Sequence, residues 1–425
     1  MDAVKGGNSV NERCRASIQT LEHEGREGAT CPPGAAMSLS QSLILRQAAM
    51  VGLDNPSLLS DLEGAGMVAE LEQGMARILG TRHVLAISSG TAALHAALLA
   101  LGIGRGDEVI VSPYSWGQSV SPVLFVGATP VFADILPDTL CIDPRSVRER
   151  ISRRTRAILP VHLFGSLAPM EPLLAIAKEH GLAIIADAAH ALGAEVEGRS
   201  AAVFGDVCCF SLGRGKLVSG GEGGLLATND TGLFQRAMAI TQHPSRTRRE
   251  FGPDCEQLHD LGYNYRIHPL AAALALASLG DLPLRLGHRR RVWNAFQQGL
   301  RTVTALRNIP CSPPDSWAAY GIALSWEGEP AYRQEIAARA QELGLPLRCG
   351  PVKTPLHLRI SQTALPFKVK RHFTHLEGAC PIAEAHCAHK EIWALSATDM
   401  DTLLPAEAHT MGEKLQALIS SYVIS

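Results

Sequence analysis

The sequence predicts an α/β protein with a large mixed, mostly parallel sheet, followed by a smaller C-terminal α+β domain. Two observations carry this prediction. Short apolar segments alternate with helical patterns of roughly 10–15 residues, which indicates βαβ units with helices on both faces of a sheet. Segments such as Val109–Val111 and Ala183–Ala186 are apolar throughout, as expected for strands buried on both sides. In chain order, the expected strands are His83–Ser89, Glu108–Ser112, Pro130–Ile135, Ala157–Leu163, Ala183–Asp187, Val207–Ser211 and Gly224–Thr228.

The helices expected between these strands follow the helical period of apolar residues. They are Ala92–Leu101, Pro144–Ile151, Glu171–His180 and Leu233–Ile240. The stretch Gln242–Pro269 is rich in Gly, Pro, Arg and Asn without a clear period, so it predicts a long functional loop. Beyond this loop, the pattern predicts helices Leu270–Leu279 and Arg289–Leu300, strand Tyr320–Trp326, and helices Ala331–Leu343 and Met400–Ser421.

These elements divide the chain into three regions. Residues 1–40 contain much Gly, Glu, Arg and Ser and no sustained period, which is typical of a disordered extension. We expect residues 41–285 to form the large, ligand-binding domain and residues 286–425 to form the small domain.

The bulk composition excludes several classes of protein. The 425 residues include 39 Lys and Arg against 41 Asp and Glu, so no global basic field would attract nucleic acid or an anionic membrane. No apolar run approaches the roughly 18 residues that a membrane-spanning helix needs. The first residues lack the apolar core of a secretory signal. The ten cysteines include no C-x-x-C pair, which favours reduced thiols in a cytoplasmic protein.

Two polar clusters do not predict sites of their own. His386 and His389 lack a second pair of ligands at a recognisable spacing, so we expect no metal site. The run Arg289–Arg291 predicts a solvated helix face, with a role in binding an anionic substrate as the alternative.

Two segments at strand ends indicate a phosphate-bearing ligand with a ring nitrogen. Ser88–Thr91 lies between a strand and a helix, where free backbone N–H groups and hydroxyls can hold a phosphate; an ordinary helix cap is the alternative. Asp187 ends the strand Ala183–Asp187, where parallel sheets bind ligands. Its carboxylate could keep a pyridinium nitrogen protonated, or it could be a helix cap or part of a structural ion pair.

A lone lysine, Lys216, lies between the glycine-rich segments Ser211–Gly215 and Gly220–Gly224. The phosphate-loop pattern fails here because Leu217 follows the lysine where that pattern needs Ser or Thr. A partly desolvated lysine suits Schiff-base chemistry, although a surface lysine in a flexible loop is the alternative. A phosphate cradle, a ring-nitrogen acid and a Schiff-base lysine together are what pyridoxal phosphate requires.

From about Pro56 to its C-terminus the sequence resembles the DegT/StrS family of sugar aminotransferases, which are fold-type-I enzymes that depend on pyridoxal phosphate. The motifs that carry the resemblance are Ser88–Leu94, Gly127–Asp134, Pro160–Gly165, Asp187–His190, Phe210–Ser211 with Lys216, Gly221–Gly224, Gly262–Arg266, Pro355–His357 and Cys380–Glu384. The glycine-rich arm Leu212–Gly215 departs from the family pattern, which carries an aromatic and bulkier residues before the lysine. That arm borders the substrate in the family, so the sugar-nucleotide specificity stays open.

The resemblance implies a role for each matching residue. Lys216 would bind the cofactor and move protons, Asp187 would pair with the pyridine nitrogen, and His190 would lie near the phenolic oxygen. Residues expected to touch the cofactor elsewhere are Gly90, Thr91 and Ser211 at the phosphate, Trp116 on the ring, and Asn264 at the phosphate of the neighbouring subunit. The site would then be shared in a homodimer. Residues expected near the substrate are Arg214, Tyr265 and His357.

These residues predict an aminotransferase that takes an amino group from glutamate or glutamine and gives it to a ketone on a sugar nucleotide or cyclitol. Aminosugar or antibiotic biosynthesis would be its setting. One alternative is elimination, cyclisation or aromatisation of a cyclic ketone, as in aminohydroxybenzoate synthesis. The other is a non-catalytic protein that binds pyridoxal phosphate. Consumption of an amino donor would separate the first from the others.

Overall fold

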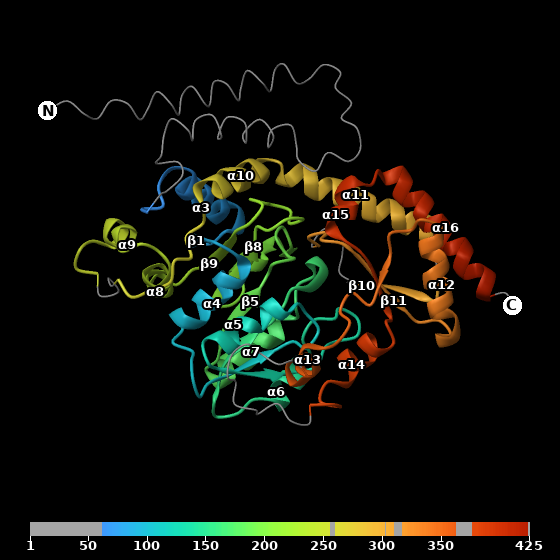
Figure 1. Ribbon diagram of the computed structural model, residues 1–425, viewed down its shortest axis with the longest axis horizontal. Helices are drawn as coiled ribbons and strands as arrows, with labels where there is room; N and C mark the ends of the chain where they lie inside the picture. Colours follow the sequence, from blue (N-terminus) through green and yellow to red (C-terminus); the bar gives the residue numbers. More distant parts are fainter. Residues whose placement is uncertain (1–61, 256–259, 302, 310–316, 363–375, 424–425) are drawn as a thin grey trace, which may run out of the picture. The chain divides into compact units, whose positions relative to one another are not determined.

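A seven-stranded sheet forms the centre of the first half of the chain, with strand order β1–β9–β8–β5–β4–β2–β3 (Figure 1). Its strands are β1 (His83–Ile87), β2 (Glu108–Val111), β3 (Thr129–Phe132), β4 (Thr155–Leu159), β5 (Ala183–Asp187), β8 (Val207–Ser211) and β9 (Gly224–Thr228). Strand β9 pairs antiparallel with both of its neighbours, and the other pairs are parallel. The predicted mixed, mostly parallel sheet is confirmed.

This computed structural model describes residues 62–255, 260–301, 303–309, 317–362 and 376–423. The extension predicted for residues 1–40 lies outside the described residues. Strands β5, β8 and β9 have the predicted bounds. Strand β4 ends at Leu159, before its predicted end at Leu163, because Pro160 follows and cannot donate a hydrogen bond to a neighbouring strand.

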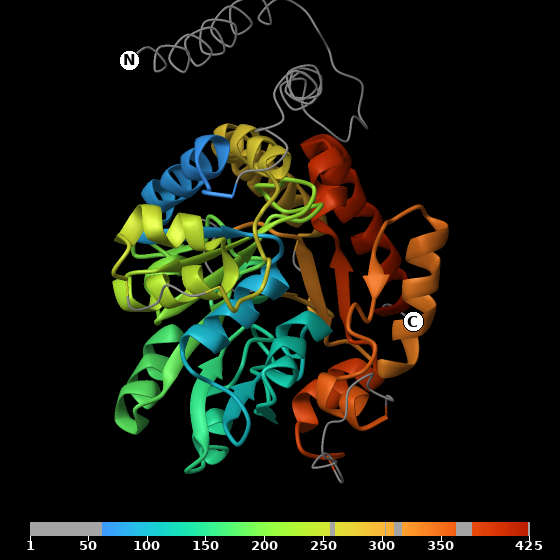
Figure 2. The ribbon, with the colours of Figure 1, turned by 60° about the vertical axis from the view of Figure 1, so that its left-hand side comes forward.

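Helices cover both faces of this sheet, as the alternating pattern predicts. Alternate residues of β1 and β8 face different helices: Leu85 and Cys209 join the cluster that includes helices α4 and α8, whereas Val84 and Cys208 join the one with α3 and α10. Figure 2 shows α3 and α10 side by side above the sheet. The helices of this region are α3 (Gly66–Leu79), α4 (Gly90–Ala100), α5 (Ser121–Phe125), α6 (Pro144–Glu149), α7 (Met170–His180), α8 (Thr231–Thr241), α9 (Pro244–Phe251) and α10 (Pro269–Gly280).

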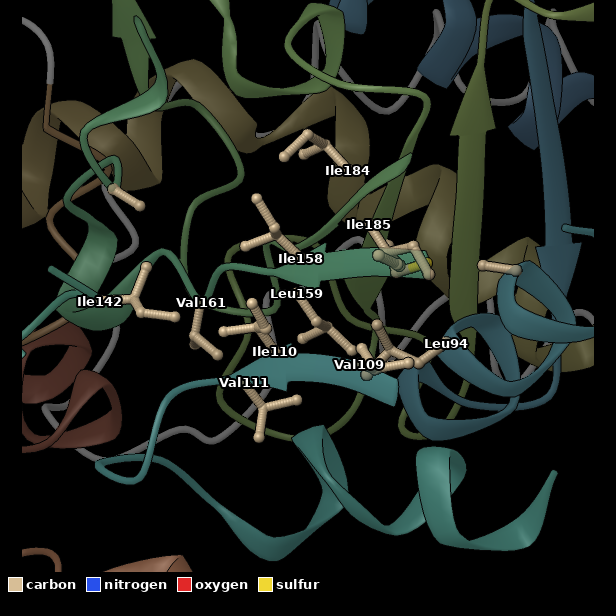
Figure 3. Close-up of a cluster of buried hydrophobic side chains, with 14 of the residues drawn as sticks. Leu94, Val109, Ile110, Val111, Ile142, Ile158, Leu159, Val161, Ile184 and Ile185 are labelled. Carbon is tan, nitrogen blue, oxygen red and sulfur yellow. The ribbon is translucent and has the colours of Figure 1, made fainter. Parts of the chain in front are cut away.

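The interior of the sheet is packed with aliphatic side chains (Figure 3). Val109, Ile110 and Leu159, from the neighbouring strands β2 and β4, are fully buried. Burial of such a side chain contributes about 1.5–3 kcal/mol relative to exposure. The strand ends that carry polar residues are therefore anchored by a closely packed apolar layer.

The loop predicted for Gln242–Pro269 contains a helix, α9, so the prediction of an irregular segment was wrong in part. Pro244 occupies the first turn, where its missing N–H costs nothing, and the His243 side chain accepts a hydrogen bond from the backbone N–H of Ser245. The apolar period is weak because this helix buries Arg246, which pairs with Glu72 on α3 at 2.6 Å.

A second, four-stranded antiparallel sheet follows, in the order β10–β11–β13–β12. Its strands are β10 (Leu306–Ile309), β11 (Ile322–Trp326), β12 (Arg348–Cys349) and β13 (Ile392–Leu395). The helices here are α11 (Leu282–Leu300), α12 (Pro330–Glu342), α13 (Leu356–Gln362), α14 (Pro381–Ala388), α15 (Ala397–Thr402) and α16 (Pro405–Val423). Helices α11 and α16 lie against each other (Figure 1).

The single helix predicted over Met400–Ser421 is two helices. Helix α15 ends at Thr402 and α16 begins at Pro405. The residue before a proline is disfavoured in helical conformation, which explains the break. The domain boundary expected at residue 285 falls in the first turn of α11 and remains a prediction.

Within the part of the chain that the structure describes, no single helix is long and apolar enough to cross a membrane; the bent pair α10 and α11 meets that test only when taken together. The described residues also contain no group of three or more metal-ligating side chains.

Candidate active site

Lys216 lies in the loop between β8 and β9, where the structure gathers several of the predicted site residues. The loop is held in shape by a backbone bridge between Gly213 and Gly221 and by a hydrogen bond from the Lys216 N–H to the Gly213 carbonyl, at 3.2 Å. The Lys216 Nζ donates a hydrogen bond to the Tyr320 hydroxyl at 3.0 Å and lies 4.6 Å from the centre of the Tyr320 ring. The amine therefore has a defined position at the end of the sheet.

Asp187, at the end of β5, is a buried carboxylate with two partners. Its Oδ2 accepts a hydrogen bond from the Ser119 hydroxyl at 2.7 Å, and its Oδ1 accepts one from the Ala189 N–H at 3.1 Å. Burial raises the pKa of this carboxyl, and the two hydrogen bonds and the charge of Lys216 act in the opposite direction. An acid in this setting can hold a proton on a nitrogen base that lies against it.

His190 lies three residues beyond Asp187 and faces the same tyrosine as the lysine. Its ring stacks on the Tyr320 ring, with the centroids 3.8 Å apart and the planes 12° apart. Burial, followed by the charge of Lys216, places the pKa of His190 well below its usual value, so the ring is neutral. Among the described residues its buried Nδ1 has no hydrogen-bond partner, which leaves it available to a bound group.

A cradle for an anion lies at the start of α4. Gly90 opens this helix beside the end of β8, and a Cβ built on Gly90 would lie 3.1 Å from the Ser211 Cβ. Ser89 caps the helix by accepting a hydrogen bond from the Ala92 N–H. The N–H groups of Gly90 and Thr91 lie in the first turn of α4, where helix geometry gives them no intrahelical partner, so they can bind phosphate oxygens; the Ser211 side chain lies beside Gly90.

These residues fit pyridoxal phosphate. The cradle at Gly90 would take its phosphate, Asp187 its ring nitrogen, and the unpartnered His190 Nδ1 a polar atom on the ring, while Lys216 is the amine that can bind its aldehyde. Each of these residues comes from a strand end or the turn beyond it, which is where the sequence places them.

The remaining predicted site residues lie around this centre at different depths. Trp116 is exposed on the loop that begins beyond β2 and ends with Ser119, the partner of Asp187. Asn264 is exposed on the segment before α10. Arg214 is also exposed, two residues from the lysine. The structure brings none of these three side chains into contact with Lys216.

The other two residues predicted near the substrate contact other parts of the fold. The Tyr265 hydroxyl is 2.9 Å from His95 Nδ1 on α4. His357 is fully buried, and its Nε2 is 2.9 Å from Glu384 at the start of α14. Both residues link elements of the fold here, and their substrate roles stay predictions.

The sequence reasoning missed Tyr320 and Ser119, which touch Lys216 and Asp187. Tyr320 lies just before β11, about one hundred residues beyond the lysine (Tyr320 and Lys216 are 104 positions apart). Tyr320 begins the predicted strand Tyr320–Trp326 and precedes Gly321, but that local pattern does not point to Lys216, and Ser119 lies outside every predicted strand and motif. The position of Tyr320 at the start of a predicted strand, beside a glycine, was the available signal.

The sequence model of the DegT/DnrJ/EryC1/StrS aminotransferase family matches residues 62–402. The chain belongs to this family. GDP-perosamine synthase from Caulobacter vibrioides is 35% identical over 295 residues, which are 68% of this chain and 77% of that protein. A Streptoalloteichus tenebrarius protein named as an L-glutamine:3-amino-2,3-dideoxy-scyllo-inosose aminotransferase is 40% identical over 201 residues, 47% of this chain and 48% of that protein.

The structure of NtdA from Bacillus subtilis, with bound cofactor PMP, has the same fold, with a TM-score of 0.75, 22% identity and coverage of 93% of this chain and 86% of that chain. DegT/DnrJ/EryC1/StrS aminotransferases depend on pyridoxal phosphate and have the fold-type-I architecture. The predicted family, fold type, cofactor and enzyme class are therefore confirmed, and this family member is a pyridoxal-phosphate-dependent aminotransferase.

Proposed function

We propose that this aminotransferase moves an amino group from glutamate or glutamine to a ketone carried by a sugar nucleotide or a cyclitol. The observation that carries the proposal is the convergence of Lys216, Asp187 and His190 beside the anion cradle at Gly90. The relatives support the substrate class, since one is a GDP-perosamine synthase and another is named for a cyclitol aminotransferase. We infer that the product enters aminosugar or antibiotic biosynthesis.

The bound cofactor supplies an electron sink that stabilises negative charge on the carbon that exchanges its proton. Asp187 would keep the ring nitrogen of the bound cofactor protonated, and Ser119 orients the Asp187 carboxylate. Lys216 would hold the cofactor between turnovers, and its amine would accept and return the proton of the substrate carbon. Gly90, Thr91 and Ser211 would bind the phosphate, and the neutral His190 ring would lie near the phenolic oxygen. Trp116 would cover the cofactor ring.

Three exposed side chains in the loop regions support an anionic substrate and a shared site. Arg214 is exposed two residues from the lysine, where its guanidinium can meet a phosphate or carboxylate of the substrate. Leu261 and Tyr263, beside Asn264, are 84% and 47% exposed. Exposed apolar side chains in one segment favour burial against a partner. We infer a cytoplasmic homodimer in which Asn264 reaches the cofactor phosphate of the neighbouring subunit.

The test is a substrate panel with purified protein and pyridoxal phosphate. Ketosugar nucleotides and cyclitol ketones are each supplied with glutamate or glutamine, and loss of the donor is followed against formation of the aminated product. We expect stoichiometric consumption of one donor with at least one ketone of these classes. Product formed without donor consumption would instead support elimination or aromatisation of a cyclic ketone.

The Lys216→Ala variant provides the matched control. It should lose both the long-wavelength absorbance of the lysine-bound cofactor and all amino transfer, because the amine that binds the cofactor is gone. An unchanged spectrum in this variant would refute the assignment of Lys216.

A further inference from the structure

A cluster of one buried arginine, one partly buried arginine and a partly buried aspartate lies directly behind the lysine loop. Arg289 on α11 is fully buried and binds Asp401 on α15 through two hydrogen bonds, Nε to Oδ1 and Nη2 to Oδ2, both at 2.6 Å. Arg285, one turn earlier on α11, binds the Asp401 Oδ2 at 2.9 Å. The prediction of a solvated face for Arg289–Arg291 was therefore wrong at Arg289, because its partner Asp401 lies 112 positions further along the chain, beyond the reach of a local pattern.

Both arginines also bind the backbone on either side of Lys216. Arg289 Nη2 donates to the Gly215 carbonyl at 3.2 Å, and Arg285 Nη1 donates to the Leu217 carbonyl at 2.6 Å. Lys216 is thus the one residue between two carbonyls that are each held by a guanidinium of the cluster.

Ser278 at the end of α10 continues the same set of contacts. Its hydroxyl accepts a hydrogen bond from the Ser219 N–H at 3.1 Å and lies within hydrogen-bond distance of Arg285 Nη1, at 3.2 Å. The segment from Gly215 to Ser219 is therefore held along one side by α10 and α11.

The segment from Gly215 to Ser219 needs such support because its glycine-rich surroundings let the backbone adopt several conformations. Gly215 has a φ of +83°, in the left-handed region that favours glycine, and glycines occur on both sides of the lysine in the sequence. A chain of this composition samples several conformations unless side chains hold it. Because the lysine side chain is long, a small rotation of the backbone at Lys216 displaces its Nζ by a larger distance.

The ion pairs between Asp401 and the two arginines persist at neutral pH. Burial alone would raise the pKa of Asp401, but hydrogen bonds and charges from Arg289 and Arg285 outweigh burial and lower it, so the carboxylate stays ionised at neutral pH. The two-point contact between Arg289 and Asp401 also fixes the plane of the guanidinium, which a lysine at this position could not reproduce.

We propose that Arg285, Arg289 and Asp401 are positioning residues that hold the Gly215 and Leu217 carbonyls and thereby aim the Lys216 amine at Tyr320 and the cofactor. This inference rests on the proposed function of Lys216 as the cofactor-binding lysine. It also makes the C-terminal region, through Asp401, part of the device that sets the lysine's position.

The test compares Arg289→Met and Arg285→Met with Arg291→Met, a matched control on the exposed face of the same helix. The first readout is the rate at which pyridoxal phosphate binds Lys216 in cofactor-free protein, followed by absorbance. We expect Arg289→Met to slow this rate about 10- to 100-fold, because a shift of about 1 Å in a reacting group can cost up to 100-fold. Arg285→Met should slow it less, and Arg291→Met should not change it.

Two further readouts separate positioning from loss of stability. Hydrogen exchange of the backbone amides in residues 212–219 should become faster in both Arg285→Met and Arg289→Met. It should be measured at a temperature where all variants remain folded. For transamination, kcat should fall while KM for the amino donor stays within about twofold, because the donor site is intact. Arg289→Lys should restore little, since it keeps the charge but not the two-point contact.

Arg285→Met keeps the test decisive if Arg289→Met does not fold, because Arg285 is partly exposed, with 28% of its side chain accessible. Equal binding rates and equal exchange in Arg285→Met and Arg291→Met would overturn the proposal. Persistence of the cofactor absorbance in Lys216→Ala would instead overturn the proposed function, whatever the Arg285→Met and Arg289→Met variants show.

Discussion

The two sheets contribute to the active site in different ways. The seven-stranded sheet supplies chemical groups from the ends of its strands: Asp187 at the end of β5, Ser211 at the end of β8, and Gly90 after β1. The C-terminal region supplies isolated contacts, Tyr320 to the lysine amine and Asp401 to the arginines behind the lysine loop. The groups proposed to bind the cofactor are thus encoded in short motifs, whereas groups that hold those motifs in place come from distant parts of the chain.

The largest effect on activity is expected in the seven-stranded sheet, for the variant Asp187→Asn. The amide cannot carry the negative charge that keeps a ring nitrogen protonated, so we expect kcat to fall roughly 100- to 1,000-fold, as for other preorganised electrostatic partners. Steady-state amino transfer measures this, and cofactor absorbance checks that the cofactor is still bound. A decrease of less than tenfold with bound cofactor would show that Asp187 does not have this role.

The second prediction concerns the anion cradle. In Gly90→Ala the new Cβ would lie 3.1 Å from the Ser211 Cβ and 3.4 Å from the Phe210 carbonyl oxygen, so the cradle must widen. We expect the dissociation constant for pyridoxal phosphate to rise about tenfold, which equals about 1.4 kcal/mol. The matched control is Gly280→Ala at the end of α10, where a Cβ would meet nothing within 4 Å. Equal affinities in the two variants would place the phosphate elsewhere.

A smaller effect is expected on the C-terminal side, in Tyr320→Phe. This change removes the hydroxyl that accepts the hydrogen bond from Lys216 Nζ but keeps the ring that stacks on His190. Loss of a hydrogen bond to a charged group costs about 1.5–3 kcal/mol, so kcat should fall about 10- to 100-fold at most. The affinity for pyridoxal phosphate should change little. If kcat in Tyr320→Phe matched the wild type, Tyr320 would be only a packing residue.

The smallest effect concerns stability and not activity. His162 is fully buried beside Asp187, accepts a hydrogen bond from the Ala168 N–H, and has its pKa lowered by burial to about 4. The unfolded chain therefore binds a proton between about pH 6.5 and pH 4 that the folded chain does not. The free energy of unfolding should fall as the pH decreases through this window, by roughly 1.4 kcal/mol per pH unit at most.

His162→Asn keeps an acceptor for Ala168 but cannot titrate. Urea unfolding at a series of pH values should show a shallower loss of stability on acidification in this variant. Parallel curves for the variant and the wild type would mean that other groups cause the acid sensitivity.

The predictability of the site follows the same division between the two sheets. Strands β5, β8 and β9 have their predicted bounds because continuous apolar runs end at polar or glycine residues. The positions of Asp187 and Lys216 followed from those strand ends, and the position of Gly90 followed from the end of the strand predicted over His83–Ser89. By contrast, α9 escaped prediction because a buried ion pair between Arg246 and Glu72 replaces its apolar stripe.

Long-range pairs explain the other misses. Arg289 looks like one of three surface arginines in the sequence, and only the folded chain brings Asp401 to it. Tyr320 similarly meets Lys216 across 104 positions. Local periodicity carries no information about such contacts, because it reports which face of an element is apolar and not which distant side chain lies opposite.

The most direct test of the central claim is the site of attachment of the cofactor. Borohydride reduction of the protein loaded with pyridoxal phosphate, followed by proteolysis and mass spectrometry of the peptides, shows which lysine carries the pyridoxyl group. We predict the group on Lys216, with slower attachment in Arg289→Met than in Arg291→Met. Attachment to another lysine, such as Lys178 or Lys353, would contradict the account.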